Sequence, residues 1–419
     1  MRAKRDPAAR FRLRALPALL ALSLALAPEA IARAAQLDAV FANQGQPNRF
    51  CPSDGSGGFL ACQNVSADVA SSAGVALGDL NHDGNLDAVF ANTGQPNRVC
   101  LGNGKGGFTC SDVSADADDS TAVALDDLNH DGNLDAVFAN LNQRNRVCLG
   151  NGLGGFSGCT DVSADSEAST GVALGDLNHD GNADAVFANA GEPNRVCLGN
   201  GLGGFSGCSD VSPDTDLSGG VALGFVNGDA NLDAVFANDG LDQVCLGDGA
   251  GGFSSCAYFN VNDLSVEVAL GFLDGDGNVD AVLANLGQPN RVCLGDGTGG
   301  FPSCADVSPA VDNSSGVVLG DLDRNGTLDA VFAVLGGPSR VCLGDGMGGF
   351  ASCADVSPDT EQSQAVALGS VISTPAPAPA MSQGSLLAAF TVLVAIAAVQ
   401  LKRRKPLPTA ARRAGATGG

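Results

Sequence analysis

The residues best suited to chemistry are acidic and amide side chains at alternate positions of one short, glycine-turned loop. Its first complete copy, DLNHDGNLD, offers side-chain oxygens from four residues: Asp79, Asn81, Asp83 and Asp87. Calcium takes about six to eight hard oxygen ligands, and such a loop converges them when a glycine, here Gly84, permits a sharp turn. We expect the main-chain carbonyl of Asn85 to add a further ligand. The spacing therefore predicts a calcium site in this loop.

Three further copies of the loop keep this pattern. Their predicted ligands are Asp127, Asn129, Asp131, Asn133 and Asp135; Asp176, Asn178, Asp180, Asn182 and Asp184; and Asp321, Asp323, Asn325, Thr327 and Asp329. Two altered copies carry Phe225 and Phe272 at the first position, and we expect them to bind calcium weakly or not at all. Clustered carboxylates repel one another without an ion, so we predict about four structural Ca²⁺ sites. The alternative is an acidic turn that binds no metal.

The segment after each loop excludes an EF-hand. That motif needs a bidentate Glu and then a helix, whereas here an apolar strand begins at once. The three histidines, His82, His130 and His179, stand at the fourth loop position. A side chain at this position points away from the metal in such loops, so we expect the histidines to be solvated.

The loops belong to a repeat whose period bounds the fold. The apolar segment after each loop, LDAVFAN or a variant, begins at residues 37, 86, 134, 183, 232, 279 and 328, a step of 47 to 49 residues. It is apolar on both faces, as strands buried on both sides are. Short runs before the loop, around RVCLG and after the NGKGG hairpin supply three more strands. Four strands in a unit of this length are typical of a propeller blade.

The two ends of the repeat region complement each other. Residues 37–43 form a second strand without a first, and residues 365–369 form a first strand without a second. If these strands pair, residues 36–372 make seven closed blades and leave no exposed sheet edge. We therefore predict an all-β fold, a seven-bladed β-propeller closed by pairing of its N- and C-terminal strands. An open solenoid is the alternative, but it gives no reason for the complementary half-units.

Fourteen cysteines fall into seven evenly spread pairs. The pairs are Cys51/Cys62, Cys100/Cys110, Cys148/Cys159, Cys197/Cys208, Cys245/Cys256, Cys293/Cys304 and Cys342/Cys353. Each pair brackets a hairpin turn, so its members face each other across the third and fourth strands. We predict one disulfide per unit and an oxidising compartment. Zinc is a poor alternative, because the spacing matches no common ligand pattern.

One cysteine pair differs from the others in spacing. Cys100 and Cys110 are one residue closer than the members of the other pairs. The extra residue in the other units predicts a β-bulge after Phe156 and its equivalents, relative to Phe108.

The charge is strongly negative and unevenly spread. Of the 22 Lys and Arg, 7 precede Gln36 and 6 follow Thr374, so 22 − 13 = 9 remain between them, against 44 of the 46 Asp and Glu. The repeat region thus carries 9 − 44 = −35, which repels nucleic acid and suits cations. Six arginines recur before the third strand: Arg49, Arg98, Arg146, Arg195, Arg291 and Arg340. They could form a ring on one face, but we expect each to pair with nearby acidic residues.

At DLNHDGNLDAVFAN and CLGNGKGGF the chain resembles the FG-GAP/VCBS repeat family, whose integrin-alpha-like propellers have seven blades. The resemblance covers about residues 36–370. It implies a calcium loop between the first two strands of a blade. The two cysteines per unit depart from the family pattern.

The segments outside the repeats have the layout of export and anchoring signals. Residues 1–35 carry a basic start, an apolar run and small residues, as in a secretory signal peptide; a retained anchor is the alternative. A Pro/Ala-rich linker at 373–384 precedes an apolar stretch at 385–401, which we expect to be a transmembrane or sorting helix, and a basic cytoplasmic tail at 402–419. This end resembles bacterial sorting signals of the PEP-CTERM/IPTL type. We therefore expect the propeller outside the cytoplasm of a bacterial cell, at the envelope or cell surface.

These features predict a membrane-anchored, calcium-binding adhesion or interaction module with a protein or glycan ligand. Some relatives of this fold cleave polysaccharides or phosphodiesters, so an enzyme is one alternative, and a lectin is another. Against catalysis, no His, Lys, Ser or carboxylate breaks the repeat in a way that suggests a lone catalytic group. Against a lectin, the chain has no Trp on which a sugar could stack. Tyr258 and Phe259 replace the usual Asp-Val, so we expect either a partner contact there or a drifted core.

Overall fold

The structure is a computed structural model that describes residues 36–372, except for the side chains of residues 260–262. The predicted signal peptide, linker, C-terminal helix and basic tail lie outside the described residues. Within the part that is described, no helix has the length and apolar character needed to cross a membrane.

All regular elements of the described residues are strands, as predicted. They are β1 (Asp38–Asn43), β2 (Arg49–Cys51), β3 (Gln63–Asn64), β4 (Ser72–Gly78), β5 (Asp87–Asn92), β6 (Arg98–Gly102), β7 (Phe108–Asp112), β8 (Ser120–Asp126), β9 (Asp135–Gln143), β10 (Arg146–Gly150), β11 (Phe156–Asp161), β12 (Glu167–Gly175), β13 (Asp184–Asn189), β14 (Arg195–Gly199), β15 (Phe205–Asp210), β16 (Ser218–Gly224), β17 (Asp233–Gly247), β18 (Phe253–Gly271), β19 (Asp280–Gln288), β20 (Arg291–Leu294), β21 (Ser303–Asp306), β22 (Asp312–Gly320), β23 (Asp329–Gly337), β24 (Arg340–Gly344), β25 (Phe350–Asp355) and β26 (Glu361–Gly369).

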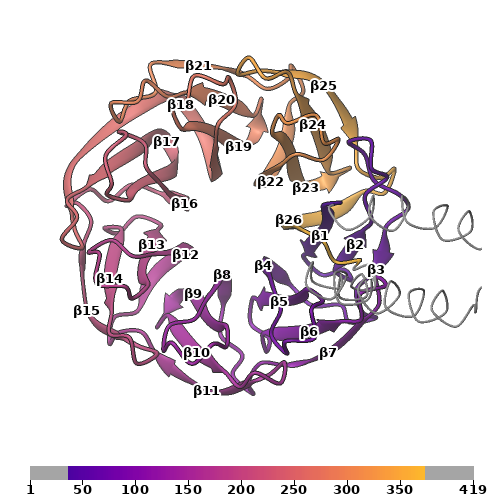
Figure 1. Ribbon diagram of the computed structural model, residues 1–419, viewed down its shortest axis with the longest axis vertical. Coiled ribbons are helices and arrows are strands. Elements are labelled where there is room, and N and C mark those ends of the chain that lie inside the picture. Colours follow the sequence, from indigo (N-terminus) through magenta and orange to yellow (C-terminus); the bar gives the residue numbers. More distant parts are fainter. Residues whose placement is uncertain (1–35, 373–419) are drawn as a thin grey trace, which may run out of the picture. The chain divides into compact units, whose positions relative to one another are not determined.

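Strands β4 to β7 show the repeating unit, an antiparallel meander in chain order. Val75 of β4 is opposite Phe90 of β5. The next pairs, Ala88 with Cys100 and Cys100 with Cys110, continue the sheet outward. All six residues of β5 are buried, as its apolar character on both faces predicts. Figure 1 shows the sheets in a ring, with β4, β8, β12, β16, β22 and β26 next to its centre.

Neighbouring sheets are held together by apolar packing of the second strands. Phe90 is fully buried and lies in one cluster with Val40 and Phe50 of the preceding unit. Phe138 packs in the same way against Val89 of β5. Because every second strand contributes to clusters on both of its faces, the core is continuous from one unit to the next.

A buried polar network also links each unit to the next. Asn97, in the turn after β5, donates to Ser120 Oγ of β8 at 2.9 Å, and this hydroxyl donates to Asn140 Oδ1 of β9 at 2.7 Å. The same contacts join Asn145 to Ser169 and on to Asn189. Satisfied buried polar groups specify one register, since leaving any of them unpaired is costly.

The first and last described strands pair with each other. Phe41 of β1 is opposite Val366 of β26, and Asp38 is opposite Gly369. Strand β26 thus supplies the inner strand of the sheet that β1, β2 and β3 continue. The predicted closure is confirmed, and Figure 1 shows the yellow end of the described chain beside the indigo start.

One part of the ring departs from the regular unit. Strand β17 runs through the second and third positions without a break, and β18 runs from a fourth strand into the next first strand. The shortest step of the repeat, from residue 232 to residue 279, falls here, and the Pro found in most of the equivalent turns is absent. A turn without Pro lets the ladder continue.

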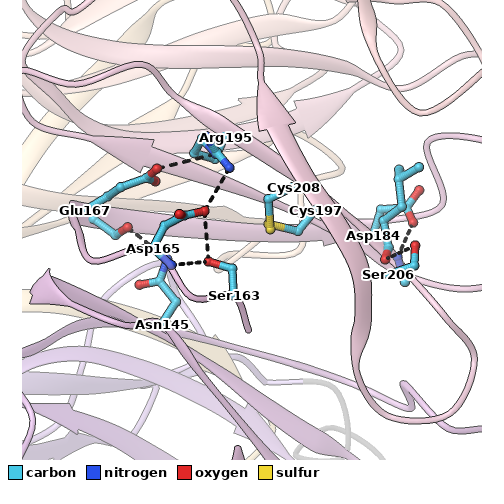
Figure 2. The surroundings of a disulfide bond; sticks show 12 residues. Asn145, Ser163, Asp165, Glu167, Asp184, Arg195, Cys197, Ser206 and Cys208 are labelled. Atoms are coloured by element: carbon cyan, nitrogen blue, oxygen red, sulfur yellow. Dashed lines mark hydrogen bonds and ion pairs between the residues drawn. A yellow bond between two sulfur atoms is a disulfide. The ribbon is translucent and has the colours of Figure 1, made fainter. Parts of the chain in front are cut away.

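All seven predicted disulfides are present, and no cysteine of the chain is free. Six of them join the third strand of a unit to its outermost strand, as Cys197 and Cys208 do in Figure 2, and Cys62 of the seventh directly precedes β3. The predicted bulge is also confirmed, because β10 and β11 shift register after Cys148 whereas β6 and β7 do not. The bond holds a strand that has a sheet partner on one side only.

Removal of one disulfide should loosen one outer strand. We expect replacement of both Cys197 and Cys208 with Ser to lower the free energy of unfolding by about 2–3 kcal/mol, because the cross-link limits the unfolded chain. Urea unfolding measures the loss, and hydrogen exchange should be faster in β15 than in β13. The exposed residue Ser209, changed to Ala, is the matched control and should leave both readouts unchanged. Equal exchange in β15 with and without the bond would contradict this role.

Candidate metal centres and the face that carries them

The first acidic loop, between β4 and β5, is folded by hydrogen bonds from its own main chain. Asp79 accepts the N–H groups of Asp83 and Gly84 at 3.1 and 2.9 Å. Asn81 Oδ1 accepts the Asp83 N–H at 3.0 Å. His82 adopts a positive φ of 58°, and Gly84 one of 82°, which together make the sharp turn. The second and third loops repeat these bonds at Asp127 and Asp176.

The loop between β22 and β23 brings three carboxylates together. Oxygens of Asp321, Asp323 and Asp329 lie within 4.8 Å of one another, and no other group of three His, Cys, Asp or Glu in the described residues is so close. Asp321 Oδ1 is buried and has no hydrogen-bond partner. An unpartnered buried oxygen beside two other carboxylates suits a cation. Because every donor atom is oxygen, the set fits a hard ion such as calcium better than zinc.

The last acidic residue of each loop has a second role that is independent of metal. Asp87 is fully buried, and its oxygens accept the N–H groups of Leu80 in the loop and Gly102 at the end of β6, at 3.0 and 2.8 Å. Burial raises its pKa to about 6, and the charges of Asp83 and Asp79 act in the same direction. Asp135 accepts the equivalent N–H groups, those of Leu128 and Gly150, and burial raises its pKa to about 6 as well. Burial likewise raises the pKa of Asp184 and Asp329.

This buried Asp keeps its bonds where the loop is altered or absent. Asp233 accepts N–H groups of Val226 and Gly247 at 2.9 Å each, although its loop begins with Phe225. Asp38 accepts N–H groups of Ser53 and Ile372 without any acidic loop before it. The residue therefore ties strand starts to hairpins throughout the ring. An Asp stands at this position in all seven LDAVFAN-type segments. This recurrence was a sequence signal for the structural role, but the sequence analysis considered only calcium binding.

The three histidines are exposed, as expected, but each also contacts the next loop. His82 Nε2 lies 2.9 Å from Asn133 Oδ1, and His130 and His179 make the same contact to Asn182 and Asn231. The expectation of purely solvated histidines was thus incomplete. The main-chain carbonyls of Asn133 and Asn182 are the predicted ligands, so these side chains are free for the histidines.

The acidic loops and the tips of the outer hairpins share one face of the ring. In an antiparallel meander the first and third connections lie on the same side. Direct contacts agree with this: Gly154 N–H donates to Leu80 O at 3.1 Å, and Gly203 N–H donates to Leu128 O at 3.2 Å. We call this side, with the acidic loops and the hairpins between third and fourth strands, the loop face.

Several apolar side chains on the loop face are largely exposed. The hairpin turns keep their Asn or Asp and their glycines, yet the residue at the tip changes from Lys105 to Leu153, Leu202, Ala250, Thr298 and Met347. Leu153 and Leu202 are 81% exposed and Met347 is 76% exposed. Phe225 and Phe272, at the first positions of the altered loops, are 50% and 58% exposed. The sequence analysis did not single out the tip residues as candidates for binding. The signal for them was one variable position in a turn whose other residues recur.

The departure at Tyr258 and Phe259 has two different outcomes. Phe259 is buried and packs against Phe301 with ring centroids 4.7 Å apart, so the core alternative is confirmed for this residue. Tyr258 is 47% exposed and donates to Asp216 at 2.9 Å. It lies opposite Gln243, where other units pair Asp with Arg, as Arg98 with Asp112.

The six repeated arginines pair with acidic residues, as expected. Arg195 contacts Asp210 at 2.9 Å on its own sheet and Asp165 at 3.1 Å in the preceding crossover. Figure 2 shows dashed lines from Arg195 to both Asp165 and Glu167. All six make at least one such pair. These arginines are therefore engaged within the ring and form no free basic surface.

Comparisons with known proteins agree with the repeat and the fold. A model of the FG-GAP-like repeat matches residues 79–138, 127–187 and 273–332. A lectin from Agrocybe aegerita, described as recognising non-reducing terminal N-acetylglucosamine, superposes with a TM-score of 0.59 at 18% identity and covers 80% of this chain and 95% of its own. The lectin BP39L from Burkholderia pseudomallei has a TM-score of 0.52 at 14% identity, covering 78% and 98%. A search of curated protein sequences found no relative.

The metal-independent role of the buried Asp can be tested in an altered loop. We expect Asp233→Ala to lower the free energy of unfolding by about 1–3 kcal/mol, because buried N–H groups lose their acceptor. The loss should be the same in calcium and in chelator. Asp229→Ala, in the exposed part of the same loop, is the control and should have a much smaller effect. Thermal unfolding measures both, and a loss seen only in calcium would contradict the structural role.

Proposed function

We propose that this chain, which carries FG-GAP-like repeats, is an exported propeller that binds a protein or glycan ligand through its loop face.

We place seven blades in the propeller. Seven equivalent positions of the inner strands support this number: Val75, Val123, Val172, Val221, Val268, Val317 and Val366. Seven disulfides, one for each third and fourth strand, agree with it.

Calcium is the proposed cofactor, held structurally in about four loops. The supporting observation is the buried, unpartnered Oδ1 of Asp321 beside Asp323 and Asp329. When bound, the ion would neutralise carboxylates that otherwise repel one another. The hairpin that contains Gly57 lies close to this loop, because a Cβ atom placed on Gly57 would be only 3.2 Å from the Cβ atom of Asp323. The ion would therefore also hold the loop against this hairpin. The ion is therefore expected to stabilise contacts between blades as well as the loop.

The single observation that carries the binding proposal is the set of exposed apolar residues on the loop face. Leu153 and Leu202 are 81% exposed, on turns whose Asn or Asp and glycines recur from unit to unit. Exposed apolar side chains that gather on one face mark interaction surfaces more often than chance exposure does. The lectins with a similar fold support a glycan as one ligand class, and a protein is the other.

The location outside the cytoplasm is supported by the cysteines and the charge. All 14 cysteines are paired, which suits an oxidising compartment. The apolar and basic stretches at 385–401 and 402–419 support anchoring at a bacterial cell envelope. We propose that the propeller is displayed on the outer side of that membrane.

Calcium should raise the stability of the protein and depend on the intact loops. Equilibrium dialysis should give about four ions per molecule, and Asp321→Ala should remove about one of them. Chelator should lower the melting temperature, since a ligand that binds only the folded state stabilises it by mass action. Asp274→Ala, in a loop without the first ligand, is the control and should leave the ion count unchanged. An equal count in Asp321→Ala and the parent protein would contradict the assignment.

Ligand binding should depend on the exposed leucines of the loop face. We expect a glycan array and cross-linking to cell-surface protein to reveal a bound set that is lost in Leu153→Ser/Leu202→Ser, because contact with their apolar surface is removed.

The control for this experiment lies on the opposite side of the ring. Val311 is 64% exposed in the crossover between β21 and β22, so Val311→Ser makes a similar change away from the loop face. It should keep the bound set. Loss of binding in Val311→Ser with retention in the double variant would place the ligand on the other face, and absence of any ligand would contradict the proposed function.

A further inference from the structure

A cavity lies where the inner strands meet. It has a volume of about 350 Å³ and is lined by residues of β4, β8, β12, β16, β18, β22 and β26, with Leu286 and Leu335. Neighbouring inner strands approach closely here. A Cβ atom placed on Gly74 would lie only 2.9 Å from the Cα atom of Ala122. We call this cavity the central channel.

One residue breaks the pattern of small side chains in the channel wall. Glu267 stands where the other inner strands have Gly74, Ala122, Gly171, Gly220, Gly316 and Ala365. The neighbouring strand leaves room for it: an ideal Cβ on Gly220 would lie 2.5 Å from Glu267 Oε1. Gly219 lines the channel and precedes Gly220, so this inner strand alone has glycine at both of these equivalent positions. The carboxyl is thus accommodated by its surroundings.

The polar groups of the wall offer acceptors and few donors. The hydroxyls of Thr121, Thr170 and Ser315 donate to the main-chain carbonyls of Ser169, Ser218 and Ser363. Gln364 donates to Gln44 at 3.0 Å. None of the lining residues is Lys, Arg or His. A ligand that brings its own N–H donors and positive charge suits such a wall.

The carboxyl of Glu267 has little compensation for its burial. Its Oε1 accepts the N–H of Val268 at 3.1 Å. Burial raises its pKa to about 7. The flanking strands β16 and β22 line the channel with Gly219, Val221, Ser315, Gly316 and Val317, and none of these titrates. A carboxylate in a channel without a counter-charge is a candidate binding group.

The rest of the wall decides which cation fits. Valines and leucines, among them Val172, Val221 and Leu286, make much of it apolar. Calcium would need about six to eight oxygens, and the channel supplies one carboxylate. An alkylammonium ion needs one charge partner for its head and apolar contact for its stem.

We propose that the central channel binds a primary alkylammonium group, with Glu267 as its charge partner. The group could belong to a free amine or to a lysine side chain of a partner protein. This site is separate from the loop face and does not depend on the ligand proposed there.

The test is a titration of the full protein with n-butylammonium chloride at pH 8, monitored by NMR or calorimetry. We expect binding that weakens at least tenfold in Glu267→Gln and at least tenfold for n-butanol, which lacks the charge. Binding should also weaken as the pH falls through about 7, because the carboxyl then takes up a proton and its pKa lies there. Nα-acetyl-lysine methylamide distinguishes the two sources: a lysine-bearing partner predicts that it binds as well as the free amine, and a free-amine site predicts that it binds less well.

Two controls separate binding from folding. Glu192→Gln removes an exposed carboxyl outside the channel and should leave butylammonium binding unchanged. In the folded protein the pKa of Glu267 is about 7, above its ordinary value of 4.5. The contribution of Glu267 to stability is therefore fully present below pH 4.5 and is lost as the pH rises through about 7. Glu267→Gln should therefore melt higher than the parent at pH 8 and equally at pH 4.5. Equal butylammonium affinity in the parent and Glu267→Gln, with both folded, would overturn the proposal.

Discussion

The antiparallel pairing of β1 with β26 is the constraint on which the rest of the ring depends. Each other sheet has its inner strand supplied by the chain segment just before it, but the sheet of β1 receives its inner strand from residues 361–369. Without that strand, Phe41 would lose Val366 and Leu368 from its apolar cluster, and Val40 would lose Ala365. Because clusters run from sheet to sheet, a loss at this point would spread to both neighbours.

Within each unit, a small set of polar contacts keeps the connections in place. The buried Asp at the start of the second strand holds the acidic loop and the end of the third strand, and the Asn–Ser contacts hold the turn to the next unit. A disulfide then holds the outer strand. These contacts leave the hairpin tips and the first loop positions free to vary, and the exposed leucines and phenylalanines occur at those places.

The sequence predicted the period, the strand order, the disulfides and the closure, because each depends on local patterns that repeat. The bulge after Phe156 followed from a one-residue difference in cysteine spacing. The buried role of Asp87 was not foreseen, since an acidic residue in a metal-like loop has an obvious alternative use. Contacts between units, such as Asn97 with Ser120 or Glu267 over Gly220, depend on how sheets pack, and no local pattern encodes that distance.

Native-state hydrogen exchange is the most direct test of the closed ring. The account predicts that amides of β1 and β26 are protected as strongly as those of the equivalent pair β13 and β12, since both pairs have the same register of partners. Exchange of β26 at the rate of an unstructured segment, with β12 still protected, would show that the ring is open and would contradict the account.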